Sequence, residues 1–343
     1  MKSYWSSGVL ALCIGIVSQG GAQVLEGPKG PVEFVGLEKW TASELFKAIQ
    51  EQDPDKPFHA CAAVMIRSLE FPDAAAFVYM TDENDWSKGF YTVVVGVEDS
   101  AAVRYRTPGT ETVELPESWK QLRSIAEQDF VTVNTVVYIS HLHDGDDRTE
   151  KLSELAEYFG ANPENSDKVV KVLDSIAENL DHDLALEVLA KDESWSARLV
   201  ALIVLGYFPE IDASWHGVAD SLIDQAQQVR DMASKLIVGL TQTEREDPVR
   251  WSKARETLLA LLGGTYAFAF NDILKALVAT KVDPRFGTQL VQEKPELLLA
   301  YAGAHHEKFR KAALDFLVAV SGKDFGTDVE AWKAWIEESE TAR

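Results

Sequence analysis

The stretch Ala197–Phe208, with the sequence ARLVALIVLGYF, indicates the fold of this chain because its pattern returns twice farther along. The second copy runs from 229 to 240 and the third from 309 to 320. In each copy apolar residues occupy positions i, i+3, i+4, i+7, i+8 and i+11, which is one face of an α-helix. The copies also share an Arg after the first apolar position and an Ala three residues later, namely Arg198, Arg230 and Arg310 with Ala201, Ala233 and Ala313. Three such helices predict a repeated unit whose neighbours bury one another.

The repeated pattern resembles the second helix of HEAT repeats, in which an Arg beside an apolar stripe with small residues recurs. Arg198 and Arg230 are 32 residues apart, and Arg230 and Arg310 are 80 apart. The longer interval has room for one divergent unit, for which the helical stripes at 251–262 and 268–280 are candidates. The resemblance covers residues 168–340 and implies an all-α, HEAT-like α-solenoid, a fold whose extended surface usually binds other molecules.

A second resemblance lies at the C-terminal end of the chain. The sequence GKDFGTD at 322–328, followed by Trp332 and Trp335, is similar to the ending of HEAT-like proteins from bacteria. The glycines are expected to turn the chain and Asp328 to begin the last helix. The two Trp side chains, three residues apart, are then expected to cap the stack by packing on the stripe at 309–320.

The region before the repeats has the pattern of a small α+β domain. Thr41 and Glu44 form the capping box of a first helix, and a second helix is expected from His59 to Leu69. Strands are predicted at 74–80, 90–97, 103–106 and 130–139, with a helix at 116–128 before the last of them. The expected organisation is a signal peptide at 1–22, an irregular arm at 23–35, the α+β domain at 36–140, a linker with a short helix at 141–167, and the helical repeats at 168–340.

The start of the chain predicts export. Lys2 precedes an apolar run at 8–17 that is too short to span a bilayer, and the small residues at 20–22 suit cleavage before Gln23. A periplasmic or secreted protein follows, and an anchor through an uncleaved segment or a lipid on Cys13 is the alternative. Cleavage would leave Cys61 as the only cysteine, and its apolar helical surroundings predict a buried side chain rather than a nucleophile.

Composition narrows the class of partner. The chain has 343 residues, 46% of them hydrophobic, which is enough for two domains with sizeable cores. The formal net charge is −22 and the pI is near 4.7. Such a charge argues against nucleic acid, which requires a basic face, and favours a basic protein or peptide. No apolar segment long enough to cross a membrane follows Gln23.

One sequence suggests chemistry. The candidate metal ligands His141, His143, Asp144 and Asp146 follow a predicted strand, and this arrangement resembles the His-x-His-x-Asp-His motif of metallo-β-lactamase-fold hydrolases. The motif is incomplete, because Gly145 stands where that family has Asp, and Asp146 where it has His. A polar loop between domains is the preferred interpretation, and no metal or cofactor is expected.

No catalytic residue is assigned. The sequence lacks a phosphate-binding glycine loop, a Gly-x-Ser-x-Gly turn, a His-Glu-x-x-His motif and paired Cys ligands. Trp195, Trp215 and Trp251 are candidate anchors of a binding surface, although packing is the commoner role for such residues. The repeated Arg side chains are expected to pair with carboxylates or helix ends of a neighbouring repeat rather than to bind an anion.

An exported protein-binding or peptide-binding scaffold is therefore the preferred function. A hydrolase with its site in the N-terminal domain or at the His141–His143 loop, with the repeats as a recruiting arm, is the alternative. A subunit of an envelope assembly with no activity alone is a third possibility.

Overall fold

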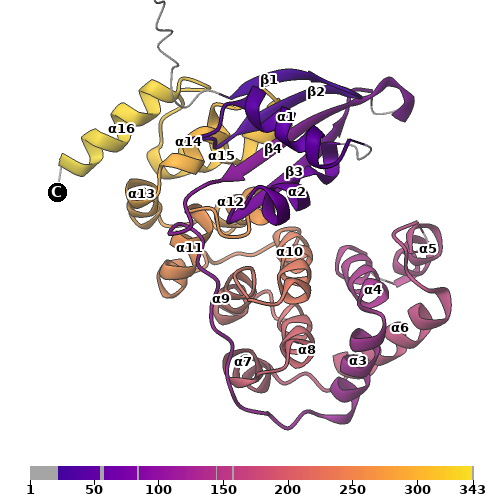
Figure 1. Ribbon diagram of the computed structural model, residues 1–343. Coiled ribbons are helices and arrows are strands. Elements are labelled where there is room, and N and C mark those ends of the chain that lie inside the picture. Colours follow the sequence, from indigo (N-terminus) through magenta and orange to yellow (C-terminus); the bar gives the residue numbers. More distant parts are fainter. Residues whose placement is uncertain (1–21, 55–57, 83–84, 144, 157, 342–343) are drawn as a thin grey trace, which may run out of the picture.

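The computed structural model describes residues 22–54, 58–82, 85–143, 145–156 and 158–341 (Figure 1). Nearly all of the predicted signal peptide, including Cys13, lies outside these residues. The described chain forms a small mixed sheet near its N-terminus and is mostly helical after it. This order confirms an α+β region followed by a helical one.

The sheet has the strand order β1-β2-β4-β3. Its strands are β1 (Gln23–Gly27), β2 (Gly30–Val35), β3 (Asp73–Met80) and β4 (Phe90–Val97). The pairs β1–β2 and β3–β4 are antiparallel, and β2 runs parallel to β4. The β1–β2 hairpin corrects the irregular arm expected at 23–35. Gly30 makes it possible, because its φ of +126° turns the chain and a Cβ there would lie 2.2 Å from the carbonyl oxygen of Phe90.

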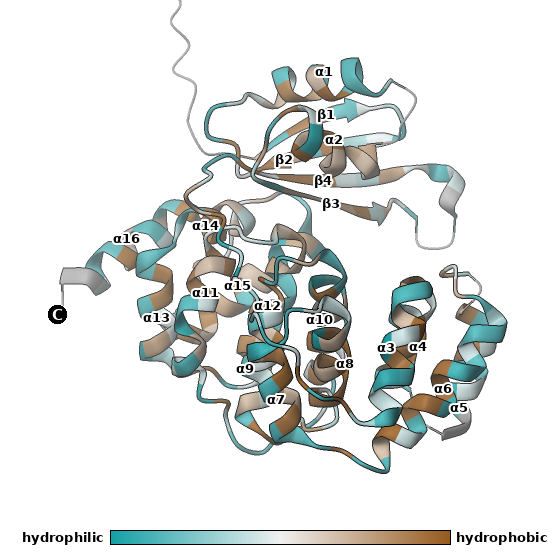
Figure 2. Cartoon of the chain, turned by 60° about the horizontal axis from the view of Figure 1, so that its bottom comes forward, coloured by the Kyte–Doolittle hydropathy of each residue, from teal (hydrophilic) through white to brown (hydrophobic). Residues whose placement is uncertain are grey.

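The sheet lies between two helical layers (Figures 1 and 2). Helices α1 (Ala42–Gln52) and α2 (Cys61–Ser68) cover one face, where Val32, Phe34 and Val94 join a small apolar core. The other face packs on the main helical region. The predicted capping box of Thr41 and Glu44 is confirmed. Cys61 is buried as expected, and burial raises the pKa of its thiol to about 12.

The helical region consists of α3 (Glu117–Gln128), α4 (Phe130–Leu142), α5 (Gly145–Leu155), α6 (Pro163–Ala177), α7 (His182–Lys191), α8 (Trp195–Leu205), α9 (Asp212–Ser221), α10 (Gln227–Thr241), α11 (Arg255–Leu262), α12 (Phe270–Ala279), α13 (Pro284–Glu293), α14 (Glu296–Ala302), α15 (Glu307–Ser321) and α16 (Val329–Thr341). Helices α8, α10, α12 and α15 contact one another in sequence and form an inner row. Helices α7, α9, α11 and α13 form an outer row beside it. The three repeated stripes lie on α8, α10 and α15, where their apolar positions are buried, except that the first stripe's last position, Phe208, lies beyond the end of α8 and is half-buried.

Two predicted strands are wrong. Residues 130–139 belong to helix α4, whose N-cap Asp129 accepts a hydrogen bond from the Thr132 N–H. This segment is rich in Val and Thr, but it is buried against α3, α6 and α10, so packing decides its conformation rather than β-propensity. Residues 103–106 form no strand of the sheet and make one isolated bridge, between Arg106 and Asp224. The main helical region therefore begins at Glu117, and the expected linker at 141–167 holds α5 and the start of α6.

The C-terminal end forms a compact turn and helix. Gly322 and Gly326 have φ angles of +67° and +54°, and the Asp328 carboxylate accepts a bond from the Ala331 N–H. The predicted turn and helix start are thus confirmed. Trp332 is fully buried and donates from Nε1 to the Gly326 carbonyl oxygen at 2.9 Å. Helix α16 packs mainly on α13 and α14 rather than on the stripe of α15, which corrects the expected partner of the cap.

Among the described residues, no single helix has the length and apolar character to cross a membrane. One pair of helical segments, Trp251–Leu262 and Ala267–Ala279, is together long and apolar enough for a membrane span, but the pair is bent by 112°.

Candidate binding cleft

The repeated Arg side chains have one role in all three units. Each donates through Nη1 to two carbonyl oxygens in the loop that precedes its helix. Arg198 bonds to Asp192 (3.1 Å) and Glu193 (2.8 Å), Arg230 to Asp224 (2.7 Å) and Gln225 (2.9 Å), and Arg310 to Ala304 (3.1 Å) and His305 (2.5 Å). The sequence predicts pairing with carboxylates or helix ends of a neighbouring repeat; the carbonyl partners lie instead within the same unit, and among the described residues only Arg198 also pairs with a carboxylate of the next unit, that of Asp224. Their donors fix the loops between paired helices and are not arranged as an anion site.

The segment that joins β4 to α3 ties the sheet to these loops. It runs extended past the ends of the paired helices (Figure 1). Its anchoring bonds run from the Arg104 N–H to Thr265 Oγ1 (2.8 Å), from the Arg106 N–H to the Ile223 oxygen (2.7 Å) and from the Glu111 N–H to the Lys191 oxygen (2.9 Å). The sheet and the inner row are therefore held in one fixed arrangement.

Much of the inner row is covered by other parts of the same chain. Residues 196–205 of α8 are all buried, and α3 packs on α8 while α4 packs on α10. At the other end, β3 lies against α15: the Phe77 ring is 5.4 Å from that of Phe309, and Tyr79 stacks on His306 at 3.9 Å. The inner surface of the repeats is thus largely occupied by the chain itself.

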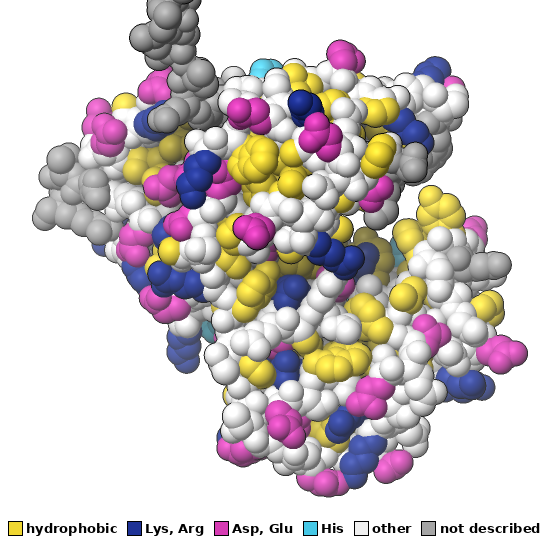
Figure 3. Space-filling model, in the orientation of Figure 1, with side chains coloured by type: hydrophobic (Ala, Val, Ile, Leu, Met, Phe, Trp, Pro, Cys, Tyr) yellow, Lys and Arg dark blue, Asp and Glu magenta, His cyan; other side chains and the backbone are white. Residues whose placement is uncertain are grey.

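One part of the inner row stays open. Figure 3 shows a hollow between the sheet and the α4–α5 part of the helical region, with apolar and basic side chains in its wall. We use the name inner cleft for the region around Tyr138 of α4, Asp231 and Lys235 of α10, Phe268, and Asp272 of α12; the Lys235 ammonium lies over the Tyr138 ring, and the charges of Asp231 and Asp272 act on it. None of these side chains is fully buried, and Phe268 is 48% exposed. Strand β3 adjoins this region, because the Phe77 ring stacks on that of Phe268 at 5.7 Å.

The charges of the inner cleft are held in poorly solvated positions. The Lys235 Nζ lies over the Tyr138 ring, 4.3 Å from its centroid, and burial lowers the pKa of this ammonium group. Burial raises the pKa of the Asp231 carboxyl, although the Tyr266 hydroxyl donates to it at 2.8 Å. Burial, together with the charge of Asp272, also raises the pKa of Tyr138. Because these groups are partly removed from water and their neighbours only partly neutralise them, they can form further hydrogen bonds or ion pairs with a bound polar partner.

The Trp residues chosen from the sequence do not line this cleft as exposed anchors. Trp215 and Trp251 are 1% and 2% exposed, and their rings pack edge to face at 6.2 Å. Trp195 is half-buried and meets Phe130 edge to face at 6.4 Å. The expectation of a surface role for Trp215 and Trp251 is corrected, because both are core residues between neighbouring helices.

The candidate metal ligands are also separated. His141 lies at the end of α4, where its ring meets Gly206 and Gly239, at positions where a Cβ would lie 2.7 Å and 3.1 Å from His141 atoms. Its Nε2 is buried without a partner among the described residues, and burial lowers the pKa of the ring to about 4. Two glycines in adjacent helix ends thus make room for one neutral imidazole.

His143 is engaged elsewhere, with its Nδ1 2.6 Å from the Asp147 carboxylate. Asp144 lies outside the described residues, and the side chain of Asp146 is not described. Within the part of the chain that the structure describes, no group of three or more His, Cys, Asp or Glu side chains could hold a metal ion. The structure therefore does not bring His141 and His143 together as ligands.

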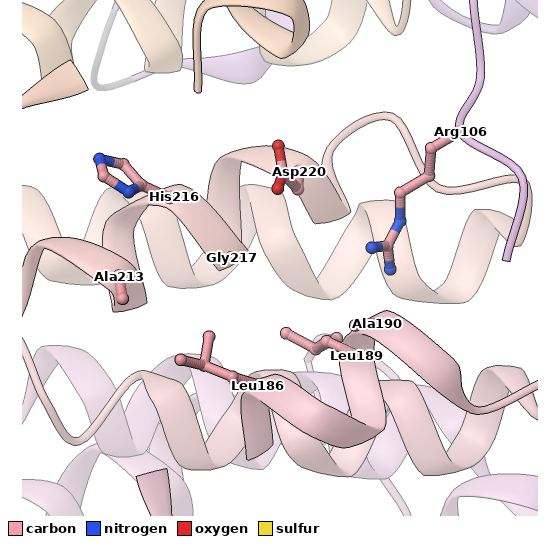
Figure 4. A pocket seen from close by; sticks show the side chains of 8 residues that line it. All are labelled: Arg106, Leu186, Leu189, Ala190, Ala213, His216, Gly217 and Asp220. Carbon is pink, nitrogen blue, oxygen red and sulfur yellow. The ribbon is translucent and has the colours of Figure 1, made fainter. Parts of the chain in front are cut away.

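A second hollow lies between α7 and α9 (Figure 4). Its polar side chains already have internal partners: Arg106 bonds to Asp224 at 2.8 Å, and His216 Nε2 is 3.0 Å from the Arg250 oxygen. Its remaining wall is formed largely by Leu186, Leu189, Ala190, Ala213 and Gly217. This hollow is an apolar groove with little polar capacity for a ligand, so the inner cleft is the stronger candidate.

The chain matches no family model, no curated protein and no solved structure. Its function is accordingly inferred from its own geometry.

Proposed function

We propose that this protein is an exported scaffold, built from HEAT-like repeats, that binds a protein or peptide in the inner cleft. The observation that carries the proposal is the open part of an otherwise largely covered inner row, where Phe268 is 48% exposed and the Lys235 ammonium lies over the Tyr138 ring. An exposed aromatic ring next to poorly solvated charges is the composition of an interface hot spot.

The proposed partner is basic. The whole chain has a net charge of −22, which accelerates encounter with cations and opposes nucleic acid. In the cleft, Asp231 and Asp272 offer carboxylates to a Lys or Arg, while Lys235 limits the net charge locally. A basic side chain that enters the cleft would offset the desolvation that raises the pKa of Asp231.

Export is the second part of the proposal and rests on Lys2, the apolar run at 8–17 and the small residues at 20–22. Expression with the native start is expected to give a periplasmic or secreted protein that begins at Gln23. N-terminal sequencing and intact mass test this. A mature protein that begins at Met1, or that carries a lipid on Cys13, would contradict it.

Site-specific cross-linking tests the binding role. A photoreactive amino acid at Phe268 is expected to capture a stoichiometric partner in the native compartment, and the same probe at Val24 is the control. Val24 is 41% exposed on β1, at the opposite edge of the sheet. Equal capture from both positions, or from neither, would reject the inner cleft as a binding surface.

Substitutions then quantify the cleft. Phe268→Ala and Lys235→Ala are each expected to weaken binding of the captured partner by about tenfold or more, as is usual for hot-spot residues. Val24→Ala is the matched control and should bind like the parent. Unchanged affinity in both cleft variants would remove the proposed function.

A further inference from the structure

Strand β3 offers an open edge beside the inner cleft. It is the last strand in the sheet order and, in the part of the chain that the structure describes, pairs only with β4. Its first residues are covered, since Asp73 accepts bonds from the N–H groups of Tyr266 and Ala267. Residues 76–80 are half-buried or exposed, and Val78 is 39% exposed. Figures 1 and 2 show this edge directed toward the helices around the hollow.

The register identifies the backbone groups at this edge. The Thr81 N–H donates to the Gly89 oxygen at 3.2 Å, so these residues form a hydrogen-bonded pair of the antiparallel ladder. Hydrogen-bonded pairs alternate with non-hydrogen-bonded ones along such a ladder. Val78, three residues before Thr81, faces Thr92 and therefore belongs to a non-hydrogen-bonded pair. The N–H and C=O groups of Ala76, Val78 and Met80 therefore point away from β4. Among the described residues, none forms a hydrogen bond with these outward groups.

This edge lacks the usual protection. Natural sheets blunt an edge with Lys, Pro, a bulge or a covering segment. Residues 76–80 have the sequence AFVYM, which contains no charge and no Pro, and the pairing with β4 is continuous from Asp73 to Met80. A partly open apolar edge of this kind is a template for another strand.

We propose that a segment of another protein, extended and carrying a Lys or Arg, adds to β3 as a further strand in the inner cleft. The inference rests on the proposed function and specifies its mode of binding. Backbone bonds to Ala76, Val78 and Met80 would hold the segment, and its alternate side chains would point to the same face as Phe77 and Tyr79.

That face contains the groups that would select the segment. Phe268 stacks on Phe77, so an apolar side chain of the added strand has an aromatic neighbour. Burial raises the pKa of the Tyr79 hydroxyl, and the negative charge of the nearby Asp272 raises it further. The Asp272 carboxylate already receives Lys275 at 3.0 Å, but the Lys275 side chain is 59% exposed and can be exchanged for a basic side chain of the partner. Charge complementarity thus favours a basic segment over an acidic one.

Val78→Pro isolates the strand addition. Pro removes the outward N–H at this edge position and leaves the bonds to β4 intact, because Pro is tolerated at strand edges. Val78→Thr keeps both the N–H and the branched shape and is the matched control. The parent chain is used to select peptides from a phage-displayed random dodecapeptide library. Selected peptides should contain Lys or Arg and bind Val78→Thr like the parent, but bind Val78→Pro at least about tenfold more weakly.

Hydrogen exchange provides the second readout. With a saturating selected peptide, the amides of Ala76, Val78 and Met80 should gain protection, whereas those of Phe77 and Tyr79, already bonded to β4, should change little. Equal binding to both Val78 variants, absence of enriched peptides on the parent, or unchanged exchange at Val78 would overturn the inference. So would a dimer of the chain that Val78→Pro abolishes, because a second copy would then occupy the edge.

The two proposals can fail separately. If the cross-linked partner depends on Phe268 and Lys235 but not on the Val78 N–H, the cleft binds a partner without strand addition. In that case only this inference is wrong. If neither the cleft variants nor Val78→Pro affects partner binding, the proposed function fails as well.

Discussion

Arg198 and Asp224 form a buried bidentate ion pair between two neighbouring helical units. The Arg198 Nε and Nη2 donate to the two carboxylate oxygens at 2.9 and 2.8 Å, and both side chains are at most 2% exposed. Arg106, from the segment that precedes α3, adds two further donors, Nη2 at 2.8 Å and Nε at 3.2 Å. Burial alone would raise the pKa of Asp224, but the hydrogen bond from Arg198 and the neighbouring charges hold it below its usual value. The carboxylate therefore joins two repeats to the N-terminal region.

Removal of this carboxylate should destabilise the fold strongly. Asp224→Leu would leave Arg198 buried without its charge partner, and we expect a loss of about 3 to 5 kcal/mol in the free energy of unfolding. Urea denaturation measures this. Glu293→Leu is the control: it removes the partly exposed partner of Arg255, for which about 1 kcal/mol or less is expected. Similar losses in both variants would show that the Arg198–Asp224 pair has no special role.

His141 should make stability depend on pH. Burial lowers its pKa to about 4, so the folded state favours the neutral ring, while the unfolded chain protonates near pH 6.5. The stability that the neutral His141 ring allows is fully present above pH 6.5. As the pH falls toward 4, the free energy of unfolding should decrease by up to about 3 kcal/mol. His141→Leu should flatten the stability profile in this window. Tyr158→Leu, at a side chain that is 72% exposed and uncharged in this pH window, is the control and should retain the profile of the parent.

Ala233 tests the register of the repeated stripe. It is fully buried on α10, so Ala233→Asp would place an unpaired carboxylate between helices and should reduce stability by at least about 3 kcal/mol. Thermal unfolding measures the change. Ala334→Asp, on the exposed side of α16, introduces the same group into water and should change stability by less than about 1 kcal/mol. A parent-like melting temperature for Ala233→Asp would contradict the register.

The C-terminal cap gives a localised prediction. Replacement of Trp332 by Ala removes a fully buried ring and its bond to Gly326, and should cost about 3 to 5 kcal/mol. Because α16 packs on α13 and α14, hydrogen exchange should rise most in these helices and little in β1–β4. Tyr158→Ala, at a side chain that is 72% exposed, is the control and should leave exchange in α13 and α14 unchanged.

Local signals were sufficient for the elements whose pattern is complete within a short window. The stripes of α8, α10 and α15 repeat with helical spacing, and the Arg of each stripe reaches loop carbonyls only a few residues away. The capping box of Thr41 and Glu44 is equally local, since its two bonds close within one turn. Such features can be predicted because no distant residue is needed to form them.

Segments that depend on their neighbours were predicted incorrectly. The segment Phe130–Leu142 is apolar around much of its circumference and rich in β-branched residues, so it shows no clear helical period. It becomes a helix because α3, α6 and α10 surround it and every backbone group must be bonded within the segment. The β1–β2 hairpin depends in the same way on β4, a strand about 60 residues farther along the chain that pairs with β2 in parallel.

By itself, the sequence determined that helical units repeat, where their Arg residues lie and that the chain is strongly acidic. Only the tertiary structure decided which part of the inner row stays open. Tyr138, Lys235 and Asp272 come from three helices that are far apart in sequence, and the edge of β3 faces them because the sheet packs on α15. The physical reason is that helical periodicity acts over a few residues, whereas a cleft is the space left when distant surfaces are buried against one another.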